Sequence, residues 1–248
     1  MFDSIPFVIE GQVRARYTDN NEVIIDTHND VLYGNMSTAL AHALIGDSDN
    51  FLTYMGFGNG GAYVNASGSI GYKNSLGGVG SLVKNPSANL YSTIYVKKLS
   101  NSATPVASYN PQSAATIPST GNTATNYEDI VVTVLLGYDE PPTAITAGEQ
   151  ITQATLDNSP FIGYAADPIN PVTFDPNTLV FNEIALYAGS SNVISGAATT
   201  TILEVDNFVN SPEKLMLTHV IFHPVQKSAN RQLEIIYTLR IQMGTIAP

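Results

Sequence analysis

The stretch QLEIIYTLRIQ, residues 232–242, decides the fold class of this chain. Apolar and polar side chains alternate along it, which is typical of a β-strand with one face buried and the other in water. The apolar face consists of Leu233, Ile235, Tyr237, Leu239 and Ile241, and Ile236 is the exception on the other face. We expect the regular face to be buried at the centre of the fold.

A second strong strand is predicted just before this one, at residues 215–223. The polar segment between them, residues 224–230, suits a hairpin connection. Residues 12–18 alternate as well, and residues 130–136 and 179–188 are continuous apolar runs of the kind found in strands buried on both faces. Shorter strands are expected at 23–25, 51–57, 90–98 and 200–205.

One short helix is predicted near the N-terminal end. Apolar residues recur there at helical spacing, and Gly46 lies where a helix stop is expected. Asn29 or Asp30 is the expected N-cap, since short polar side chains can accept a bond from the first free N–H groups. The spaced residues are Leu32, Met36, Ala39, Leu40, Ala43 and Leu44.

Many short strands, one helix and frequent turn residues predict a mainly β fold, a β-sandwich or jelly-roll-like domain. Residues 62–86 are rich in Gly, Ser and Asn, and residues 99–126 and 139–177 show no strand or helix periodicity. Structureless loops this long are uncommon inside a compact domain. We therefore expect a single domain, residues 1–248, in which the two long excursions hide weak strands or form arms and loops between subunits.

The amino-acid composition excludes several kinds of partner and binding site. The net charge is −11, and the ten basic residues are scattered, with Lys97-Lys98 the only adjacent pair, so no cationic face for nucleic acid is visible. There is no cysteine, which excludes disulfides and thiolate metal sites. No apolar run reaches the roughly 18 residues of a membrane helix, and MFDSIPFVIEG is not a secretory signal. We expect neither nucleic acid nor membrane as a partner.

Charged residues make up only 12% of the chain, about half the usual share. The polar surface is instead built from Asn, Ser, Thr and Gln. Such a surface has few ion pairs to desolvate when it is covered, which suits a protein enclosed by neighbours and also many secreted β-proteins.

A dinucleotide site is the first chemical candidate. Gly56, Gly58 and Gly61 satisfy G-x-G-x-x-G after a predicted strand, but neither a helix start nor a carboxylate about 20 residues further on accompanies them. A tight turn with close backbone approach is the favoured interpretation.

His219 and His223 are the second candidate. On a strand they share a face about 13 Å apart, too far for one zinc ion, which favours interface or half-buried histidines.

The remaining candidates are carboxylates. Asp26-Thr27 resembles the start of an aspartic-protease triplet, but His28 replaces the glycine, and no G-x-S-x-G elbow occurs. Asp47 and Asp49 could touch a calcium ion, although the EF-hand spacing is missing.

Glu183, in the apolar run 181–187, must be paired if it is buried, and Arg231 and Arg240 are the expected partners. We interpret Glu183 as structural. We therefore expect no catalytic residue, no cofactor and no metal.

Three segments, taken in order, carry a resemblance. They are MSTALAHALIGDSDNFLTYMGFGNGG (36–61), FNEIALYAG (181–189) and LTHVIFHPVQKSANRQLEIIYTLRIQM (217–243). Together they resemble structural proteins of tailed bacteriophages, among tail, baseplate and collar components. In such proteins an N/R-E-I-A/G-L-Y/F strand precedes a hairpin of the form F-x-P-x-x-K…L-E-I-x-Y/W-T-L. The matching residues are Phe222, Pro224, Lys227, Leu233, Glu234, Ile235, Tyr237, Thr238 and Leu239.

The resemblance covers about a third of the chain and implies a virion component with no catalytic residues to carry over. We expect a tail-associated adaptor in a baseplate, collar or fibre-attachment ring, made without a signal peptide. Its expected partners are itself, as a homo-oligomer, and other virion structural proteins.

Three alternatives remain open. One is a capsid decoration protein or head fibre. Another is a receptor- or glycan-binding tail protein that uses some of the 13 tyrosines. The last is a glycan-degrading enzyme, which needs two carboxylates within about 10 Å, and no such pair is marked.

Overall fold

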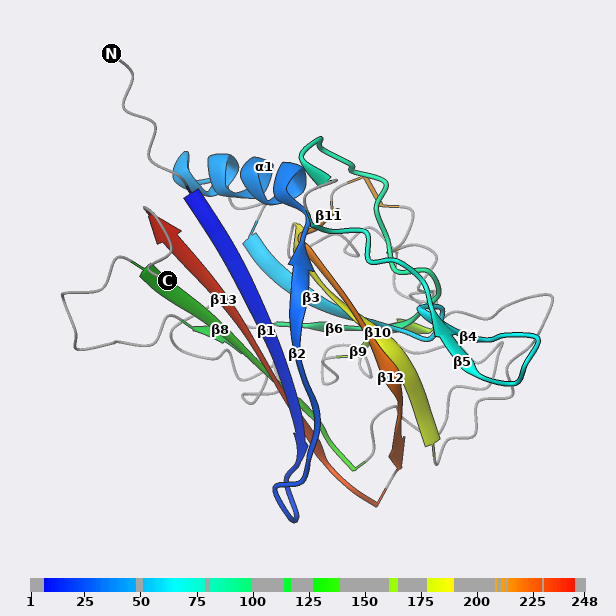
Figure 1. Ribbon diagram of the computed structural model, residues 1–248. Helices are drawn as coiled ribbons and strands as arrows, with labels where there is room; N and C mark the ends of the chain where they lie inside the picture. Colours follow the sequence, from blue (N-terminus) through cyan, green and yellow to red (C-terminus); the bar gives the residue numbers. More distant parts are fainter. Residues whose placement is uncertain are drawn as a thin grey trace, which may run out of the picture.

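The computed structural model describes residues 7–47, 51–78, 81–99, 114–116, 127–138, 161–164, 178–189, 208, 211–212, 214–228 and 230–243. These residues form one helix, α1 (Tyr33–Leu44), and strands β1 to β13 (Figure 1). The expected mainly β fold is confirmed. The strands are β1 (Phe7–Tyr17), β2 (Val23–Val31), β3 (Phe51–Gly58), β4 (Ala62–Val64), β5 (Ile70–Tyr72), β6 (Thr93–Lys98), β7 (Ala114–Thr116), β8 (Tyr127–Leu136), β9 (Phe161–Tyr164), β10 (Thr178–Gly189), β11 (Lys214–Met216), β12 (Thr218–Ser228) and β13 (Leu233–Met243).

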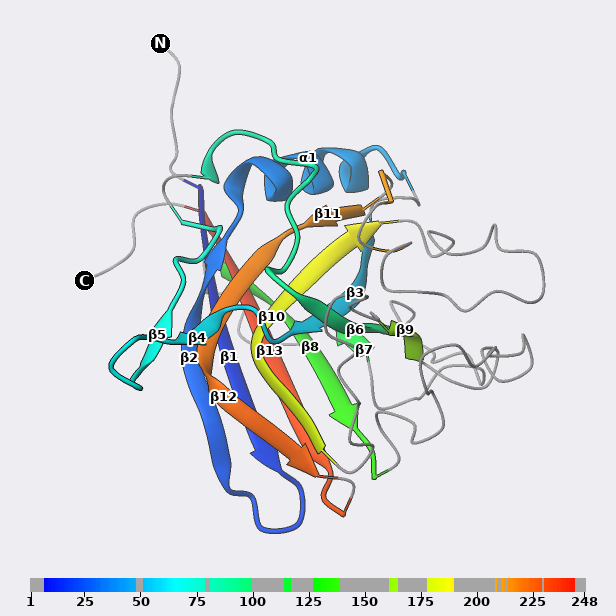
Figure 2. The same cartoon turned by 90° about the vertical axis from the view of Figure 1, so that its right-hand side faces the viewer.

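Eleven of these strands form one antiparallel sheet in the order β7-β8-β13-β1-β2-β12-β10-β3-β6-β9, with β11 paired to β10. The sheet curls so that its two halves face each other in a sandwich-like arrangement (Figure 2). Strand β2 belongs to both halves. It pairs with β1 between Val23 and Asn29 and with β12 at Asp30 and Val31. We call β7-β8-β13-β1 with the first part of β2 the first layer, and β12-β10-β3-β6-β9 the second layer.

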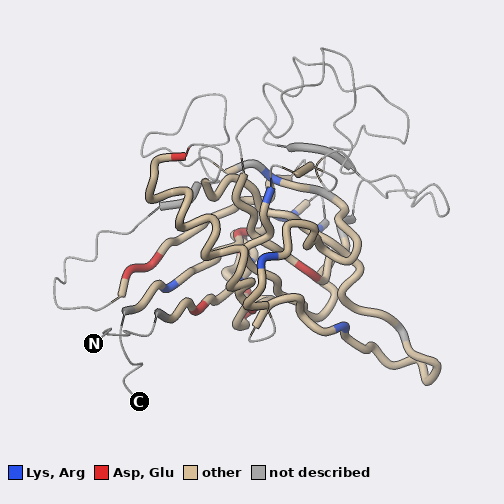
Figure 3. The backbone as a smooth tube through the Cα atoms, turned by 90° about the horizontal axis from the view of Figure 1, so that it is seen from above, with Lys and Arg blue, Asp and Glu red and all other residues tan. Residues whose placement is uncertain are grey.

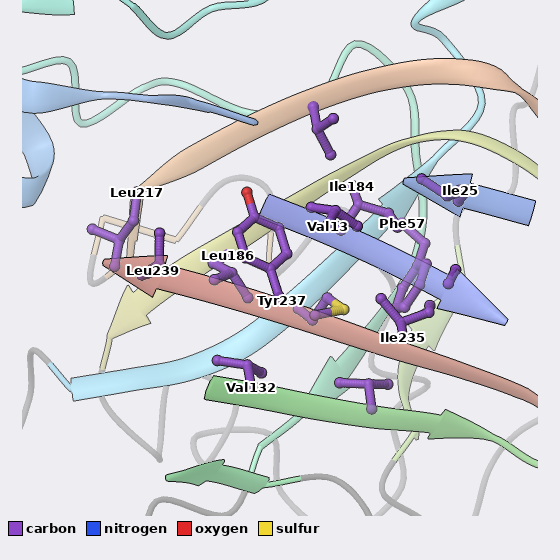
Figure 4. Packing of buried hydrophobic residues seen from close by; sticks show 14 of the residues in the cluster. Val13, Ile25, Phe57, Val132, Ile184, Leu186, Leu217, Ile235, Tyr237 and Leu239 are labelled. Carbon is purple, nitrogen blue, oxygen red and sulfur yellow. The ribbon is translucent and has the colours of Figure 1, made fainter. Parts of the chain in front are cut away.

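The main core lies between the two layers (Figure 4). In β13, Leu233, Ile235 and Tyr237 are 0% exposed and Leu239 is 2% exposed, as the alternation predicted, whereas Ile241 of the same face is only partly buried. Val13 of β1 and Val132 of β8 also belong to this core, as do Ile184, Leu186 and Phe57 of the second layer. This packing fixes the register of the C-terminal strand.

The predicted C-terminal hairpin is wrong. Strands β12 and β13 are not neighbours, because β13 pairs with β1 and β8 while β12 pairs with β10 and β2. Strand β12 also continues through the supposed connection as far as Ser228. The connection therefore passes from the second layer to the first. The β1–β2 hairpin, with Asn21 at φ +57°, is inserted between the two strands.

Helix α1 begins later than predicted, because Asn29 and Asp30 are the last part of strand β2 and do not cap it. The backbone N–H of Tyr33 instead donates to Ser81 Oγ at 3.2 Å. The predicted stop at Gly46 is confirmed. With φ +77°, Gly46 donates to the carbonyl of Ala43, and Asp47 donates to that of His42, which forms a Schellman motif. The helix packs on the core through Met36 and Ala39, whereas Leu44 is exposed.

A long connection covers the outer face of the second layer. We call it the strap, residues 59–92, of which 59–78 and 81–92 are described. It carries the β4–β5 hairpin, which projects from the body (Figure 3). Beneath it lies a second apolar cluster that includes Tyr54, Tyr187 and Phe208, and Leu90 of the strap belongs to this cluster as well.

Each long excursion contributes one short strand at a sheet edge, β7 from residues 99–126 and β9 from residues 139–177. Their other residues lie outside the described ones, apart from Leu99, which belongs to the main core. The expected strand at 200–205 also lies outside the described residues.

Candidate functional site

The most elaborate polar site is built around Glu183 of β10. Its side chain is 0% exposed. Oε1 accepts hydrogen bonds from the backbone N–H groups of Gly60 and Ser92, both at 3.0 Å, and Oε2 accepts one from Tyr91 N–H at 3.1 Å. The fourth donor is His219 Nε2, 3.1 Å from Oε2. Four donors compensate the burial of this carboxylate.

His219 of β12 is neutral in this arrangement, and its tautomer follows from its two partners. Leu76 N–H donates to Nδ1 at 3.0 Å, so Nδ1 carries no proton. The proton therefore lies on Nε2, which donates it to Glu183. The His219 carbonyl also accepts from Ser75 Oγ at 3.2 Å. His219 thus connects the Glu183 carboxylate to the middle of the strap.

The glycine cluster after β3 allows the strap to approach Glu183. A Cβ on Gly58 would lie 2.5 Å from Glu183 Oε1, and one on Gly60 would lie 2.7 Å from Ser92 N. Gly61 N–H donates to Asn182 Oδ1 at 2.8 Å, and Asn182 Nδ2 donates to the carbonyl of Asn59 at 2.9 Å. Strand β4 follows these glycines. The predicted close backbone approach is confirmed at Gly58, where a Cβ would also lie 2.6 Å from the carbonyl oxygen of Ser92.

The partners predicted for Glu183 are wrong. Arg231 lies at the β1–β2 turn and donates to both carboxylate oxygens of Asp19 at 2.9 Å. Arg240 donates to Asp129 of the neighbouring strand at 2.9 and 3.0 Å. Arg240 belongs to β13 of the first layer and Arg231 to the connection that precedes it, whereas Glu183 bonds to the strap on the outer face of the second layer.

His219 and His223 both lie on β12, as predicted, but neither is half-buried. His219 is 0% exposed, whereas His223 is exposed, and its Nδ1 is 3.1 Å from Tyr72 Oη in the β4–β5 hairpin. The histidines therefore bind different parts of the strap.

The other predicted carboxylate candidates take part in local contacts. Asp26 on β2 accepts from Gln12 Nε2 at 2.7 Å, and Asp47 is 2.7 Å from His42 Nδ1. Asp49 lies outside the described residues. Among the described residues, no three His, Cys, Asp or Glu side chains are close enough together to hold a metal ion.

A shallow depression of about 160 Å³ lies on the outer face of the first layer. Its polar lining is largely engaged in contacts of its own, since Gln12 donates to Asp26 and Arg240 donates to Asp129. Glu10, His28 and Thr238 also line it.

Sequence reasoning missed two further polar sites. Lys214 of β11 is 1% exposed; its Nζ donates to Asn89 Oδ1 and lies 5.5 Å and 5.4 Å from the ring centroids of Tyr187 and Phe208. Inside the main core, Asn29 Nδ2 donates to the hydroxyl of Tyr237, and this bond joins β2 to β13. In both cases the partner is distant in sequence, and neither Asn29, between His28 and Asp30, nor Lys214, after Glu213, stands out from its polar neighbours.

No protein-family model matches the chain, and no curated protein or solved structure is significantly similar to it. In the part of the chain that the structure describes, no helix is long and apolar enough to cross a membrane. The geometry of the Glu183–His219 site is that of a buried structural clamp. It holds the strap on the second layer.

Proposed function

We propose that this chain is a structural subunit of a tailed-bacteriophage virion, a tail-associated adaptor in a baseplate, collar or fibre-attachment ring that acts by self-assembly and docking. The proposal starts from the resemblance of segments 36–61, 181–189 and 217–243 to structural proteins of such particles. No catalytic role is assigned to any residue of these segments.

One observation carries the proposal from the structure: the three resembling segments lie together in the fold. Strand β10 pairs with β3 on one side and with β12 on the other. The last part of the third segment is β13, whose inward face packs against β3 and β10 in the main core. A pattern spread over some 200 residues of sequence thus converges on one unit of architecture.

The residues that match the pattern have architectural contacts. Phe222 packs edge-on against Phe181 with ring centroids 5.6 Å apart. Lys227 is 1% exposed and donates to the carbonyl of Gly137, which joins the second layer to the end of β8. Glu183 binds the strap. Buried motif residues that bind other parts of the same chain support a structural role, because catalysis needs groups that can reach a substrate.

The test is the composition of particles produced by the source of the sequence. Purified virions are analysed by mass spectrometry, and immunogold labelling with antibody to the purified chain locates it. We expect the chain in multiple copies per particle, with label at the tail or neck. Label on the head would favour a decoration protein or head fibre, and absence from purified virions would contradict the proposal.

An activity assay separates the proposal from the enzyme alternative. Bacterial surface polysaccharide incubated with the purified chain should release no reducing ends. Turnover that a single carboxylate-to-amide substitution abolishes would overturn the structural assignment.

A further inference from the structure

Acidic and basic residues are unevenly distributed along the chain. Residues 51–127 contain no Asp or Glu, although an even spread of the 21 acids over 248 residues would place about six there. The same stretch contains four of the ten basic residues, Lys73, Lys84, Lys97 and Lys98. The strap is part of this acid-free stretch.

Residues 139–177 have the opposite composition, with six carboxylates and neither Lys nor Arg. The six are Asp139, Glu140, Glu149, Asp157, Asp167 and Asp175. The chain therefore carries a cationic and an anionic segment that are complementary in charge.

The strap presents its cationic residues to solvent. Lys73 and Lys84 are both exposed, and Lys73 Nζ lies over the ring of Tyr91, 4.3 Å from its centroid. In Figure 3 the projecting hairpin is drawn without an acidic position. An ammonium group beside an aromatic face keeps its charge and can still attract a carboxylate.

The strap also gathers exposed apolar side chains. Of the twelve large hydrophobic residues that are exposed among the described ones, six lie on it. They are Tyr63, Ile70, Tyr72, Leu82, Val83 and Tyr91. Tyrosine is enriched in protein interfaces because it combines a large apolar ring with a polar tip. Exposed apolar rings beside isolated lysines suit a partner that is acidic and only sparsely charged.

We propose that the strap is the surface that docks the acidic segment of a second copy of this chain, residues 139–177 without β9, which pairs with β6 of its own chain. The inference rests on the proposed function, because it specifies the contact through which the subunits assemble. Segment 139–177 supplies a carboxylate every few residues, interspersed with Pro, Thr, Ile and Phe, which matches the mixed surface of the strap.

The contact joins two different surfaces of the chain, and it is therefore heterologous. A heterologous contact repeated by rotation closes into a ring or continues as a filament. Each subunit then both offers its strap and inserts its acidic segment, so that one kind of contact assembles the whole ring.

The first arm of the test measures association of the purified full-length chain by sedimentation velocity. We expect oligomers whose dissociation constant rises as salt is raised from about 0.05 to about 0.5 M, because salt screens the attraction between exposed charges. Lys73→Glu and Lys84→Glu should each weaken association about tenfold or more. Arg14→Glu, which makes the same change in charge at an exposed position of the first layer, should leave association within about twofold.

The second arm is a charge swap. Changing Asp139, Glu140, Glu149 and Asp157 to lysine should abolish self-association, as should the double variant Lys73→Glu/Lys84→Glu. Mixing these two variants should restore oligomers that contain both. Circular dichroism and melting curves confirm that each variant is folded, and salt dependence of the natural chain tests the contact without any substitution.

The outcomes separate the two proposals. A natural chain that stays monomeric at every concentration overturns the assembly function and this contact with it. Association that is insensitive to salt and to both lysine substitutions overturns the docking of 139–177 on the strap but leaves assembly standing. Association lost in the single variants and regained in the mixture establishes the contact.

Discussion

Lys97 on β6 donates a hydrogen bond from Nζ to the backbone carbonyl of Leu135 on β8. In the order of the sheet, β8 is next to one end and β6 is next to the other. The bond therefore closes the curl of the sheet by joining the first layer to the second. Lys97 is 1% exposed, so its aliphatic stem packs like an apolar side chain. The main core lies inside this closure.

The register of β13 can be tested by comparing Leu239→Ala with Gln242→Ala. Leu239 is 2% exposed in the main core, whereas Gln242 lies on the opposite face of the same strand. We expect Leu239→Ala to lower the free energy of unfolding by about 2–5 kcal/mol and Gln242→Ala by less than about 0.5 kcal/mol. Chemical denaturation of both variants measures the difference. Equal stability of the two variants would contradict the assigned register.

The Glu183 clamp can be tested with Glu183→Gln. An amide has one acceptor oxygen, and its NH₂ group then faces two of the four donors. We expect the free energy of unfolding to fall by about 2–4 kcal/mol, because each unsatisfied buried donor costs about 1–3 kcal/mol. The amides of Gly60, Tyr91 and Ser92 should also exchange with deuterium faster. The control is Glu10→Gln, at an exposed position. Unchanged protection of the three amides in Glu183→Gln would show that the carboxylate does not hold the strap.

The alternation of residues 232–242 was enough to predict which face of β13 is buried, because packing against a core imposes a period of two on a strand. Its neighbours could not be predicted in this way. Strand β13 pairs with β1, more than 200 positions earlier in sequence, and periodicity carries no information about such pairing. For the same reason the sequence favours a hairpin of two strong strands that are close together in the chain, although β12 and β13 do not pair.

The Glu183 site shows the same contrast: its burial can be predicted from the sequence, but its partners cannot. Glu183 on an apolar strand predicts a buried, partnered carboxylate, and this is confirmed. Arginine was expected as its partner because charge pairing is the simplest compensation for burial. The actual donors are three backbone N–H groups and one imidazole, and backbone donors leave no mark in the sequence. The glycines at 56, 58 and 61 are the signal of close backbone approach in the sequence, and Gly58 lies beside Glu183.

Gly58→Ala tests that close approach directly. The new Cβ would lie 2.5 Å from Glu183 Oε1 and 2.6 Å from the carbonyl oxygen of Ser92, so the strap must move. We expect the free energy of unfolding to fall by about 1–3 kcal/mol. Gly68→Asn is the control, since Gly68 has φ +80° with nothing within 4 Å, and asparagine tolerates this conformation. Equal melting temperatures for the two variants would mean that the strap is not closely packed at Gly58.

Lys214 should make stability depend on pH in the alkaline range. Burial lowers the pKa of this amine from 10.5 to about 8. The folded state therefore releases its proton near pH 8, while the unfolded chain keeps it until well above pH 9. Because the unfolded state binds more protons in this window, stability rises with pH. We expect the free energy of unfolding to increase by about 1–2 kcal/mol between about pH 7.5 and about pH 9.5.

The upper limit of that window is set by tyrosine. Burial raises the pKa of Tyr187 and of Tyr237, so their ionisation in the unfolded chain near pH 10 begins to favour unfolding.

Urea denaturation at several pH values between about 7.5 and about 9.5 measures how steeply the free energy of unfolding rises with pH. Lys214→Met should remove this slope and raise stability at about pH 7.5, because no amine must then be buried. Lys84→Met, at an exposed lysine, should keep the slope of the natural chain. If Lys214→Met retained the slope, the titrating group would be another residue, and Lys214 would not be the buried amine that loses its proton near pH 8.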